Sequence, residues 1–273
     1  MSLQQSLQRA QTLGLARIDV QMLHLFALGR EPHDRAWLLA HDRDDLLAAT
    51  AERLEPLLQR RLAGEPLAYI TGHKGFFGLD LQVDKRVLDP RPDTETLVAW
   101  ALELLPPEAT ARLLDLGTGS GAVALALKHQ RPQCHVTAVD DSQEALAVAQ
   151  SNAQRLHLPV HCVHSHWMDE LTGPFELIVS NPPYVAEDDP HLAALAHEPL
   201  QALISGPDGL DDIRLIVGQA TSRLAPGAWL LIEHGWDQAN KVQDLLQQAG
   251  YQKVQSRPDL SGIDRCTGGV WLG

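Results

Sequence analysis

Apolar residues in the first 73 positions recur at the spacing of amphipathic helices. The first such set, with members three or four residues apart, is Leu3, Leu7, Ala10 and Leu13. Further helices are predicted over 18–28, 33–40 and 46–63. Pro56 lies inside the last of these and predicts a kink or a break, because proline removes a helical hydrogen bond. No strand-like alternation appears here, so residues 1–73 are predicted to form a small N-terminal helical domain.

The pattern changes between residues 74 and 90. Residues 76–83 alternate as a half-buried strand does, and Arg86–Leu88 is a candidate partner strand. Residues 74–90 are therefore predicted to be a β-hairpin linker. Asp93 follows and is the expected N-cap of the next helix, because its carboxylate can accept a free backbone N–H.

Further along, short apolar strands alternate with helices. The predicted strands are 112–116, 135–139, 160–163, 175–180, 228–232, 251–256 and 269–272. The predicted helices are 122–129, 142–155, 211–223 and 237–248. Strands that are apolar almost throughout are typical of a parallel sheet covered by helices on both faces. Residues 91–273 are therefore predicted to form an α/β domain.

The composition narrows the class of protein. The 273 residues are 44% hydrophobic and 21% charged, and no apolar run approaches the ~18 residues of a membrane helix. The N-terminus has no signal-peptide pattern, and Cys134, Cys162 and Cys266 form no CxxC pair, so a cytoplasmic location is expected. A net charge of −13 opposes binding to nucleic acid and favours a basic protein partner.

A glycine-rich loop joins the first strand of the α/β domain to the helix behind it. Its candidate cofactor-binding residues are Gly117, Thr118, Gly119, Ser120 and Gly121. Glycines permit a sharp turn and close approach of a ligand to the backbone. Asp140 ends the next strand, where a carboxylate can accept hydrogen bonds from both hydroxyls of a ribose. The loop and the acid together predict a nucleoside cofactor.

The glycine spacing alone does not choose that cofactor. The sixth position of the dinucleotide pattern GxGxxG is Ala122, which NAD sites tolerate. Asp115, two residues before the first glycine, disfavours a pyrophosphate and favours a cationic ligand such as S-adenosylmethionine. A NAD-dependent oxidoreductase and a turn without any ligand stand as alternatives.

Asn181, Pro182, Pro183 and Tyr184 follow the predicted strand 175–180, at the edge of the sheet where ligands bind in open α/β folds. Prolines lack a backbone N–H, so this turn offers carbonyl acceptors and few donors. A substrate group with N–H bonds, either a carboxamide or an amino-purine, suits such a turn. Taken alone, the tetrapeptide also fits a turn that merely ends a strand.

Three histidines, His161, His164 and His166, lie close together in the sequence. On a strand, His164 and His166 share one face and His161 points to the other, and no carboxylate joins them at ligand spacing. With 13 histidines in the chain, we attribute the cluster to chance and predict no metal site. Trp167 follows at the end of a strand and is a candidate for stacking on a base.

The glycine loop and the turn Asn181–Tyr184 together resemble a group of methyltransferases that act on amino groups. Two branches share these motifs: DNA adenine-N6 methyltransferases and the release factor glutamine N5-methyltransferases of the PrmC/HemK family. Segments that resemble the second branch are 64–70 (GEPLAYI), 90–95 (PRPDTE), 198–203 (EPLQAL), 233–235 (EHG), Asp259, Gly262 and Arg265. The resemblance implies a Rossmann-like domain with a seven-stranded, mostly parallel sheet.

The resemblance also implies the reaction. The chain is expected to transfer methyl from S-adenosylmethionine, leaving S-adenosylhomocysteine, to the N5 atom of the glutamine in the Gly-Gly-Gln motif of class 1 peptide chain release factors. Asn181 and the carbonyl of Pro182 are expected to accept the two amide N–H groups. Tyr184 is expected to pack against the substrate side chain, with Pro183 completing the substrate site.

For the cofactor, the resemblance assigns the methionine portion to residues 117–121, the ribose to Asp140 and the adenine to Trp167. It also counts Asn181 among the cofactor-binding residues, in addition to its role toward the substrate. Three features depart from the family pattern: Asp89 replaces an apolar residue, His166 replaces an acid, and the segment 190–198 is short. The alternatives are a DNA or RNA adenine-N6 methyltransferase and a binding module without activity.

Overall fold

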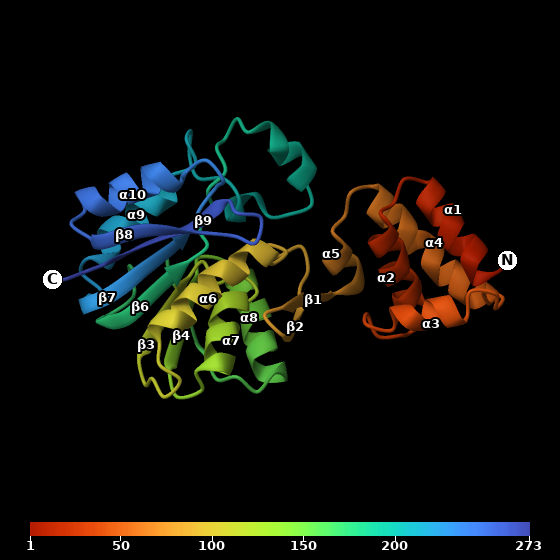
Figure 1. Cartoon of the computed structure of the whole chain (residues 1–273), viewed down its shortest axis with the longest axis horizontal. Helices are drawn as coiled ribbons and strands as arrows, with labels where there is room; N and C mark the ends of the chain where they lie inside the picture. The colour runs from red at the N-terminus through yellow and green to blue at the C-terminus, as the bar shows by residue number, and fades with distance from the viewer. The chain divides into compact units, whose positions relative to one another are not determined.

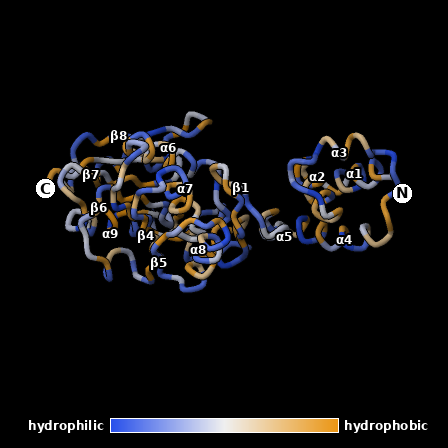
Figure 2. The backbone as a smooth tube through the Cα atoms, turned by 90° about the horizontal axis from the view of Figure 1, so that it is seen from below, coloured by the Kyte–Doolittle hydropathy of each residue, from blue (hydrophilic) through white to orange (hydrophobic).

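A computed structural model describes all residues from Met1 to Gly273. The chain divides into two compact units, Met1–His73 and Lys74–Gly273 (Figure 1). Figure 2 shows hydrophobic and hydrophilic segments alternating along the chain in both units. None of the helices combines the length and the apolar character that crossing a membrane requires.

The first unit is built around helices, as predicted. These are α1 (Leu3–Thr12), α2 (Arg17–Ala27), α3 (Arg35–Ala40), α4 (Ala48–Leu62) and α5 (Leu67–Thr71). Leu23 of α2 packs with Leu54 and Leu58 of α4 in a buried core. Ser2 and Gln5 cap α1 reciprocally: Ser2 Oγ accepts the Gln5 N–H at 3.2 Å, and Gln5 Oε1 accepts the Ser2 N–H at 2.9 Å.

Two details of the first unit differ from the prediction. Helix α4 passes through Pro56 without a break. Pro56 is exposed, as is Glu52, so water can bond the carbonyl that loses its helical partner. The short helix α5 was not predicted; it begins after Pro66 and ends at Gly72, whose φ of 77° is left-handed.

The second unit contains the predicted α/β sheet. Its strands are β3 (Arg112–Leu116), β4 (His135–Asp140), β5 (His161–His164), β6 (Phe175–Ser180), β7 (Leu224–Glu233), β8 (Gln252–Pro258) and β9 (Asp264–Val270). They lie in the order β5-β4-β3-β6-β7-β9-β8, with β9 antiparallel to both neighbours and the other pairs parallel. The predicted seven-stranded, mostly parallel sheet is therefore confirmed.

Helices cover both faces of this sheet. One layer holds α6 (Glu95–Leu104), α7 (Ala122–Gln130) and α8 (Gln143–Arg155); the other holds α9 (Asp211–Ala220) and α10 (Ala239–Gln248) (Figure 1). One hydrophobic core lies between the sheet and the second layer, where Ile213 and Ile216 of α9 and Val242 of α10 are fully buried. Short 3₁₀ turns are η1 (Pro92–Thr94), η2 (Pro190–Leu195) and η3 (Leu200–Ala202).

The hairpin is shorter than predicted. It consists of β1 (His73–Phe76) and β2 (Leu79–Gln82), which form a separate two-stranded sheet. The chain turns at Phe77 and Gly78, whose φ angles are 46° and 80°, so the predicted strand 76–83 is interrupted. The predicted partner strand Arg86–Leu88 is wrong, because these residues form a turn that lines the cavity described below.

Asp93 is not the helix cap that the sequence suggests. It lies within η1, and α6 begins at Glu95 with no side-chain cap. The Asp93 carboxylate instead approaches Arg265 of β9 at 3.5 Å. The prediction is wrong because residues 92–94 form a 3₁₀ turn that places Thr94, and not Asp93, at the start of α6.

Strand β9 begins five residues earlier than the predicted start at 269, since it runs from Asp264. Its sequence contains polar residues and two glycines, so no apolar run marks it. Gly268 is required by packing: a Cβ atom there would lie 2.4 Å from Leu231 Cδ2 and 2.9 Å from the Trp100 ring. Contacts with other elements, rather than local pattern, therefore define this strand.

Asn152 of α8 attaches the hairpin to the rest of the second unit. This fully buried side chain bonds the backbone N–H of Gln82 at 2.7 Å, the Gln82 carbonyl at 2.9 Å and the Ser120 carbonyl at 3.0 Å. One carboxamide thus satisfies backbone groups of the hairpin and of the glycine loop.

We expect Asn152→Ala to lower the free energy of unfolding of the second unit by about 2–4 kcal/mol, because it leaves buried backbone groups without partners. Denaturant unfolding of the variant against the wild type measures this change. Asn240→Ala, at an exposed position of α10, is the matched control. Equal stability of Asn152→Ala and this control would contradict the role of Asn152.

Candidate active site

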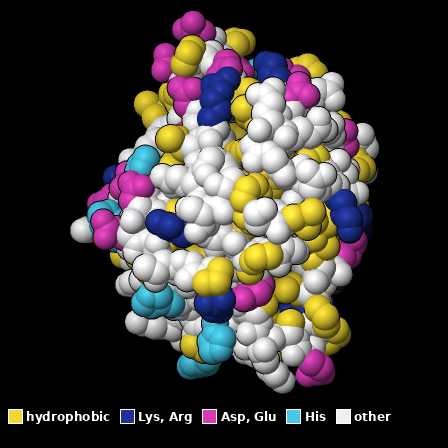
Figure 3. Space-filling model, turned by 90° about the vertical axis from the view of Figure 1, so that its left-hand side faces the viewer, with side chains coloured by type: hydrophobic (Ala, Val, Ile, Leu, Met, Phe, Trp, Pro, Cys, Tyr) yellow, Lys and Arg dark blue, Asp and Glu magenta, His cyan; other side chains and the backbone are white.

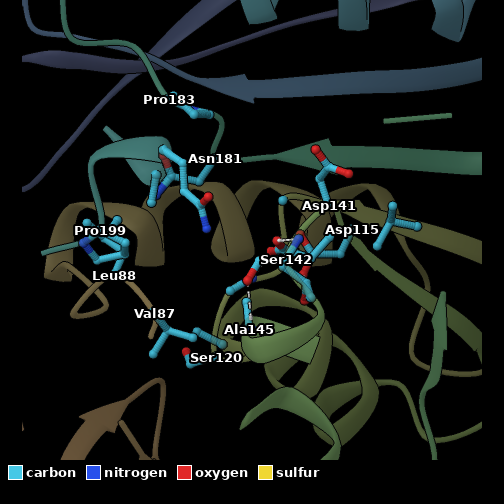
Figure 4. A pocket seen from close by; sticks show the side chains of 18 of the residues that line it. Val87, Leu88, Asp115, Ser120, Asp141, Ser142, Ala145, Asn181, Pro183 and Pro199 are labelled. Atoms are coloured by element: carbon cyan, nitrogen blue, oxygen red, sulfur yellow. Dashed lines mark hydrogen bonds between the residues drawn. The ribbon is translucent and has the colours of Figure 1, made fainter. Parts of the chain in front are cut away.

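The candidate site is a cavity of roughly 220 Å³ at the carboxyl ends of β3, β4 and β6 (Figure 4). Distant segments line it: the glycine loop, the end of β4, Trp167, Asn181 and Pro183. Parallel pairing of β3 and β6 brings these segments together, since Leu116 at the end of β3 lies beside Ser180 at the end of β6. The Ser180 hydroxyl donates to the Leu116 carbonyl at 2.9 Å, which ties the two strand ends together.

The glycine loop has a left-handed backbone at all three glycines, with φ of 69° at Gly117, 55° at Gly119 and 84° at Gly121. Thr118 and Ser120 line the cavity with Gly117 and Gly119. Gly121 does not; it precedes α7, and a Cβ atom there would lie 3.0 Å from Leu125 Cδ1. The role of Gly121 is therefore close packing of the helix behind the loop.

Asp140 holds the loop in place. Its Oδ2 atom accepts the N–H of Gly119 at 2.9 Å, and its Oδ1 atom accepts the N–H of Ser142 at 2.9 Å. Burial raises the pKa of this carboxyl, and the two backbone donors oppose that rise. Asp140 thus orders the glycine loop through its hydrogen bonds, and it also lines the cavity beside that loop.

Asp115 lies below the loop and is almost completely buried. One of its oxygens accepts the Thr118 hydroxyl at 2.6 Å and the N–H of Ala124 at 3.1 Å. Burial raises its pKa to about 7, with these two donors acting in the opposite direction. Asp115 thus shapes the loop and places an acid that titrates near neutrality at the cavity wall.

Trp167 lies over the glycine loop. Its φ of 45° turns the chain, and its indole N–H donates to Asp212 at 3.1 Å. A Cβ atom on Gly117 would lie 3.4 Å from the Trp167 ring, so the glycine allows the ring to approach. His166 also lines the cavity, and its Nδ1 atom lies 3.5 Å from an Asp169 carboxylate oxygen.

Asn181 extends its carboxamide toward the cavity (Figure 4). Its Nδ2 atom donates to Thr94 Oγ1 at 3.1 Å, which leaves the carbonyl oxygen Oδ1 for a ligand. Pro183 lines the cavity, whereas Pro182 and Tyr184 do not. The Tyr184 carbonyl accepts from Gln238 Nε2 at 3.0 Å, and burial raises the pKa of its hydroxyl.

Two residues of the site have no role assigned from sequence patterns: Thr94 and Glu233. Thr94, in the segment 90–95, is buried and lines the cavity. Glu233 ends β7 and is 1% exposed; burial raises its pKa to about 7, while the Thr94 hydroxyl beside it acts to lower the pKa. The resemblance to the family marked both segments, but only the structure brings these side chains together beside Asn181.

An ion-pair cluster fastens the segment after the Asn181 turn. The buried Glu198 carboxylate pairs with Arg91 and accepts the N–H of Asp89 at 3.3 Å. Asp89, the departure from the family pattern, pairs with Lys74 at 2.9 Å and lies 3.8 Å from Arg91. Lys74 and Arg91 therefore balance the negative charge of Asp89, and the cluster holds Pro199 at the cavity wall.

No group of three or more His, Cys, Asp or Glu side chains in the structure is arranged so that it could hold a metal ion. His164 Nε2 instead bonds the Asp141 carbonyl at 2.9 Å.

Comparisons with known proteins agree with this architecture. Residues 94–203 match the family model "Methyltransferase small domain", and residues 2–72 match "PrmC N-terminal domain". A methyltransferase structure from Pyrococcus furiosus has a TM-score of 0.56 at 20% identity, covering 79% of this chain and 97% of that one. The fold and the site thus define a methyltransferase with a Rossmann-like sheet.

Curated relatives show to which family of methyltransferases the chain belongs. A release factor glutamine methyltransferase of Bordetella pertussis is 49% identical over 94% of this chain and 95% of its own length. One from Escherichia coli strain K12 is 41% identical, covering 97% of this chain and 96% of its own length. The chain belongs to the release factor glutamine methyltransferase family, which confirms the resemblance found in its sequence.

We expect ionisation of Asp115 to lower the free energy of unfolding of the ligand-free protein as pH rises, because folding raises the pKa of this carboxyl from 3.8 to about 7, so that Asp115 holds its proton more tightly in the folded than in the unfolded state. The contribution of protonated Asp115 to stability is fully present below the pKa of the unfolded state and is lost as pH rises through the pKa of the folded state. Between about pH 5.5 and pH 8, ionisation of Asp115 lowers the free energy of unfolding by about 2 kcal/mol.

Asp115→Asn keeps an oxygen that can accept from Thr118 and Ala124 but removes the titrating carboxyl. The free energy of unfolding of this variant should therefore vary less with pH than that of the wild type. Asp141→Asn, at an exposed carboxylate of the same cavity, is the control and keeps the wild-type slope. Denaturant unfolding at both pH values measures the difference, and identical slopes for Asp115→Asn and wild type would contradict the assignment.

Proposed function

We propose that this chain methylates the side-chain amide nitrogen N5 of the glutamine in the Gly-Gly-Gln motif of class 1 peptide chain release factors, with S-adenosylmethionine as donor. The observation that carries the proposal is the position of Asn181: its carboxamide faces the same cavity as the glycine loop and Asp140. Membership of the family, at 49% identity to one curated member over nearly the whole chain, supports the same reaction.

The residues present fit the cofactor. The Asp140 carboxylate lines the cavity, and a Cβ atom built on Gly119 meets nothing within 4 Å, so the loop leaves open space for a ligand against its backbone. A 16S rRNA methyltransferase of T. Thermophilus, solved in complex with AdoMet and guanosine, shares the fold with a TM-score of 0.55 at 21% identity, over 72% of this chain and 49% of that one.

In the proposed assignment, residues 117–121 hold the methionine portion, Asp140 the ribose and Trp167 the adenine. Of these, Gly121 acts through packing and does not line the cavity. When bound, S-adenosylmethionine supplies a methyl group on a positively charged sulfur. The acidic wall formed by Asp115 and Asp140 favours a cation there.

Catalysis is proposed to consist of positioning the acceptor. The lone pair of an amide nitrogen is conjugated with its carbonyl, so the nitrogen is a weak nucleophile and orientation is the main contribution available. Asn181 Oδ1 accepts one N–H of the glutamine, and the Pro182 carbonyl is the proposed acceptor for the other. Pro183 contacts the substrate from the cavity wall, and Tyr184 supports the turn.

We propose three functional segments: the helical domain 1–73, the hairpin linker 74–90 and the methyltransferase domain 91–273. The two compact units and the matched ranges 2–72 and 94–203 support this organisation. We place the protein in the cytoplasm, consistent with its three free cysteines.

A DNA or RNA adenine-N6 methyltransferase is the second candidate, because an amino-purine also carries N–H donors. The net charge of −13 opposes it. On the face shown in Figure 3, Lys and Arg side chains are scattered among acidic and hydrophobic ones. A protein acceptor therefore fits this chain better.

The decisive assay offers labelled S-adenosylmethionine with purified release factor and DNA side by side. We expect label on the release factor and none on DNA, and we expect no transfer to a release factor whose Gly-Gly-Gln glutamine is replaced by alanine. Label that persists on this variant would refute the assigned target atom. Cofactor binding without transfer to any acceptor would indicate a module without activity.

Asn181→Ala and Asp140→Ala should fail in different ways. Asn181→Ala should lower kcat/KM for the release factor by about 100-fold with little change in cofactor affinity, because its carboxamide holds the acceptor. Asp140→Ala should weaken cofactor binding by roughly 10–100-fold, because charged hydrogen bonds are lost and the glycine loop loses its anchor.

Calorimetry gives the cofactor affinity, and initial rates of methyl transfer give kcat/KM. Asn240→Ala controls for asparagine replacement at an exposed site. Equal losses of binding and turnover in Asn181→Ala would show that Asn181 belongs to the cofactor site.

A further inference from the structure

Thr94 lies between Asn181 and a buried acid. Its hydroxyl oxygen accepts Asn181 Nδ2–H at 3.1 Å, and the same hydroxyl lies close enough to the Glu233 carboxyl to lower its pKa. Thr94 is 3% exposed and Glu233 is 1% exposed, so water does not compete strongly for these groups. The three side chains come from η1, the turn after β6, and the end of β7.

The direction of the hydrogen bonds in this group decides which end of the Asn181 carboxamide faces the cavity. A hydroxyl has one proton to donate, whereas an ionised carboxylate can only accept. If the Thr94 hydroxyl donates its hydrogen bond to Glu233, its oxygen must accept from Asn181, and Oδ1 of Asn181 faces the cavity. If the hydroxyl instead donates to Asn181, the carboxamide is reversed and its N–H groups face the cavity.

The second arrangement is unproductive for an amide acceptor, because N–H groups of Asn181 would face N–H groups of the glutamine. We propose that Thr94 and Glu233 are positioning residues: the Glu233 carboxylate accepts a hydrogen bond from the Thr94 hydroxyl, and the Thr94 oxygen then accepts from Asn181 and holds its carbonyl oxygen toward the acceptor amide. The catalytic consequence of this inference rests on the proposed function.

Glu233 is suited to this task because one of its oxygens, Oε2, is buried with no hydrogen-bond partner. A buried oxygen of this kind is costly and retains its capacity to accept. Donors in a chain also strengthen one another, so a bond from Nδ2 to Thr94 makes Oδ1 of Asn181 a better acceptor.

Other groups around Glu233 set when it is ionised. Burial and the Asp93 carboxylate raise its pKa, whereas Arg265 and the Tyr184 hydroxyl lower it, and the result is about 7. Cys266, its neighbour on β9, is buried, and its own pKa is raised well above the usual value, so the thiol stays neutral and adds no charge. Orientation of Asn181 should therefore improve as pH rises through about 7.

The chain offers a direct measurement of this orientation, since its asparagines are Asn152, Asn181 and Asn240 alone. Selective ¹⁵N-asparagine labelling gives three side-chain amide pairs, and the pair missing in Asn181→Ala identifies Asn181. In the wild type we expect one proton of that pair to exchange slowly with water, and we expect the pair to titrate near pH 7 with Glu233.

Three variants separate orientation from general packing. Thr94→Val keeps the shape and removes the hydroxyl, so the Asn181 proton should exchange at least about 10-fold faster. Thr94→Ser keeps the hydroxyl and should restore slow exchange. Glu233→Gln keeps the shape without the ionisable group, so the titration of the Asn181 pair should disappear.

Methyl transfer tests the consequence. We expect Thr94→Val to lower kcat by at least about 10-fold while the cofactor dissociation constant changes by less than about threefold, and Thr94→Ser to recover most of the rate. Glu233→Gln should lower kcat and remove the increase in rate between about pH 6 and pH 8. A loss of folding would instead reduce cofactor binding and rate together.

The inference is overturned if the Asn181 amide pair is the same in Thr94→Val and the wild type, or if Thr94→Val and Thr94→Ser have equal kcat. If the wild type labels no release factor, the proposed function falls; the amide spectra, which need no acceptor, then decide alone whether Thr94 and Glu233 orient Asn181.

Discussion

The parallel pairing of β3 with β6 is the constraint on which the site depends. It places Leu116 beside Ser180, and the Ser180 hydroxyl donates to the Leu116 carbonyl. The glycine loop and the Asn181 turn therefore leave the sheet at one edge and at one level. A shift of one residue in this register would turn every side chain of the shifted strand to the opposite face and would displace the two loops relative to one another. The packed core behind the strands, with Ile178 and Leu230 fully buried, opposes such a shift.

Buried acids are the second feature of the site. Asp115 and Glu233 are each almost fully buried, and burial raises the pKa of both to about 7. Hydroxyl groups lie beside both acids: Thr118 donates to Asp115, and Thr94 lies next to Glu233. Such acids lower stability when ionised, so their presence is consistent with a cationic ligand near Asp115, which lines the cavity, and with the proposed orienting role for Glu233.

The local hydrophobic pattern predicted those elements whose own residues show a clear apolar run or periodicity. The central strands β3, β4 and β6 are mostly apolar, and the structure has them where the pattern predicts them. The antiparallel strand β9 begins earlier than predicted; its Gly268 is required by close packing against Trp100 and Leu231, which a local pattern does not record. Asp93 was assigned as a cap because its neighbours in sequence suggest one, yet Arg265 is its partner.

The sequence by itself determined the fold class, the family and the identity of the two loops, because periodicity and short motifs are encoded locally. Only the tertiary structure decided which residues of those loops face the cavity: Asn181 and Pro183 do, whereas Pro182, Tyr184 and Gly121 do not. It also joined Thr94 and Glu233 to Asn181, although 139 and 52 residues of sequence separate Glu233 from Thr94 and from Asn181. The physical reason is that hydrogen-bond direction and burial depend on neighbours that chain folding supplies, and no local pattern records them.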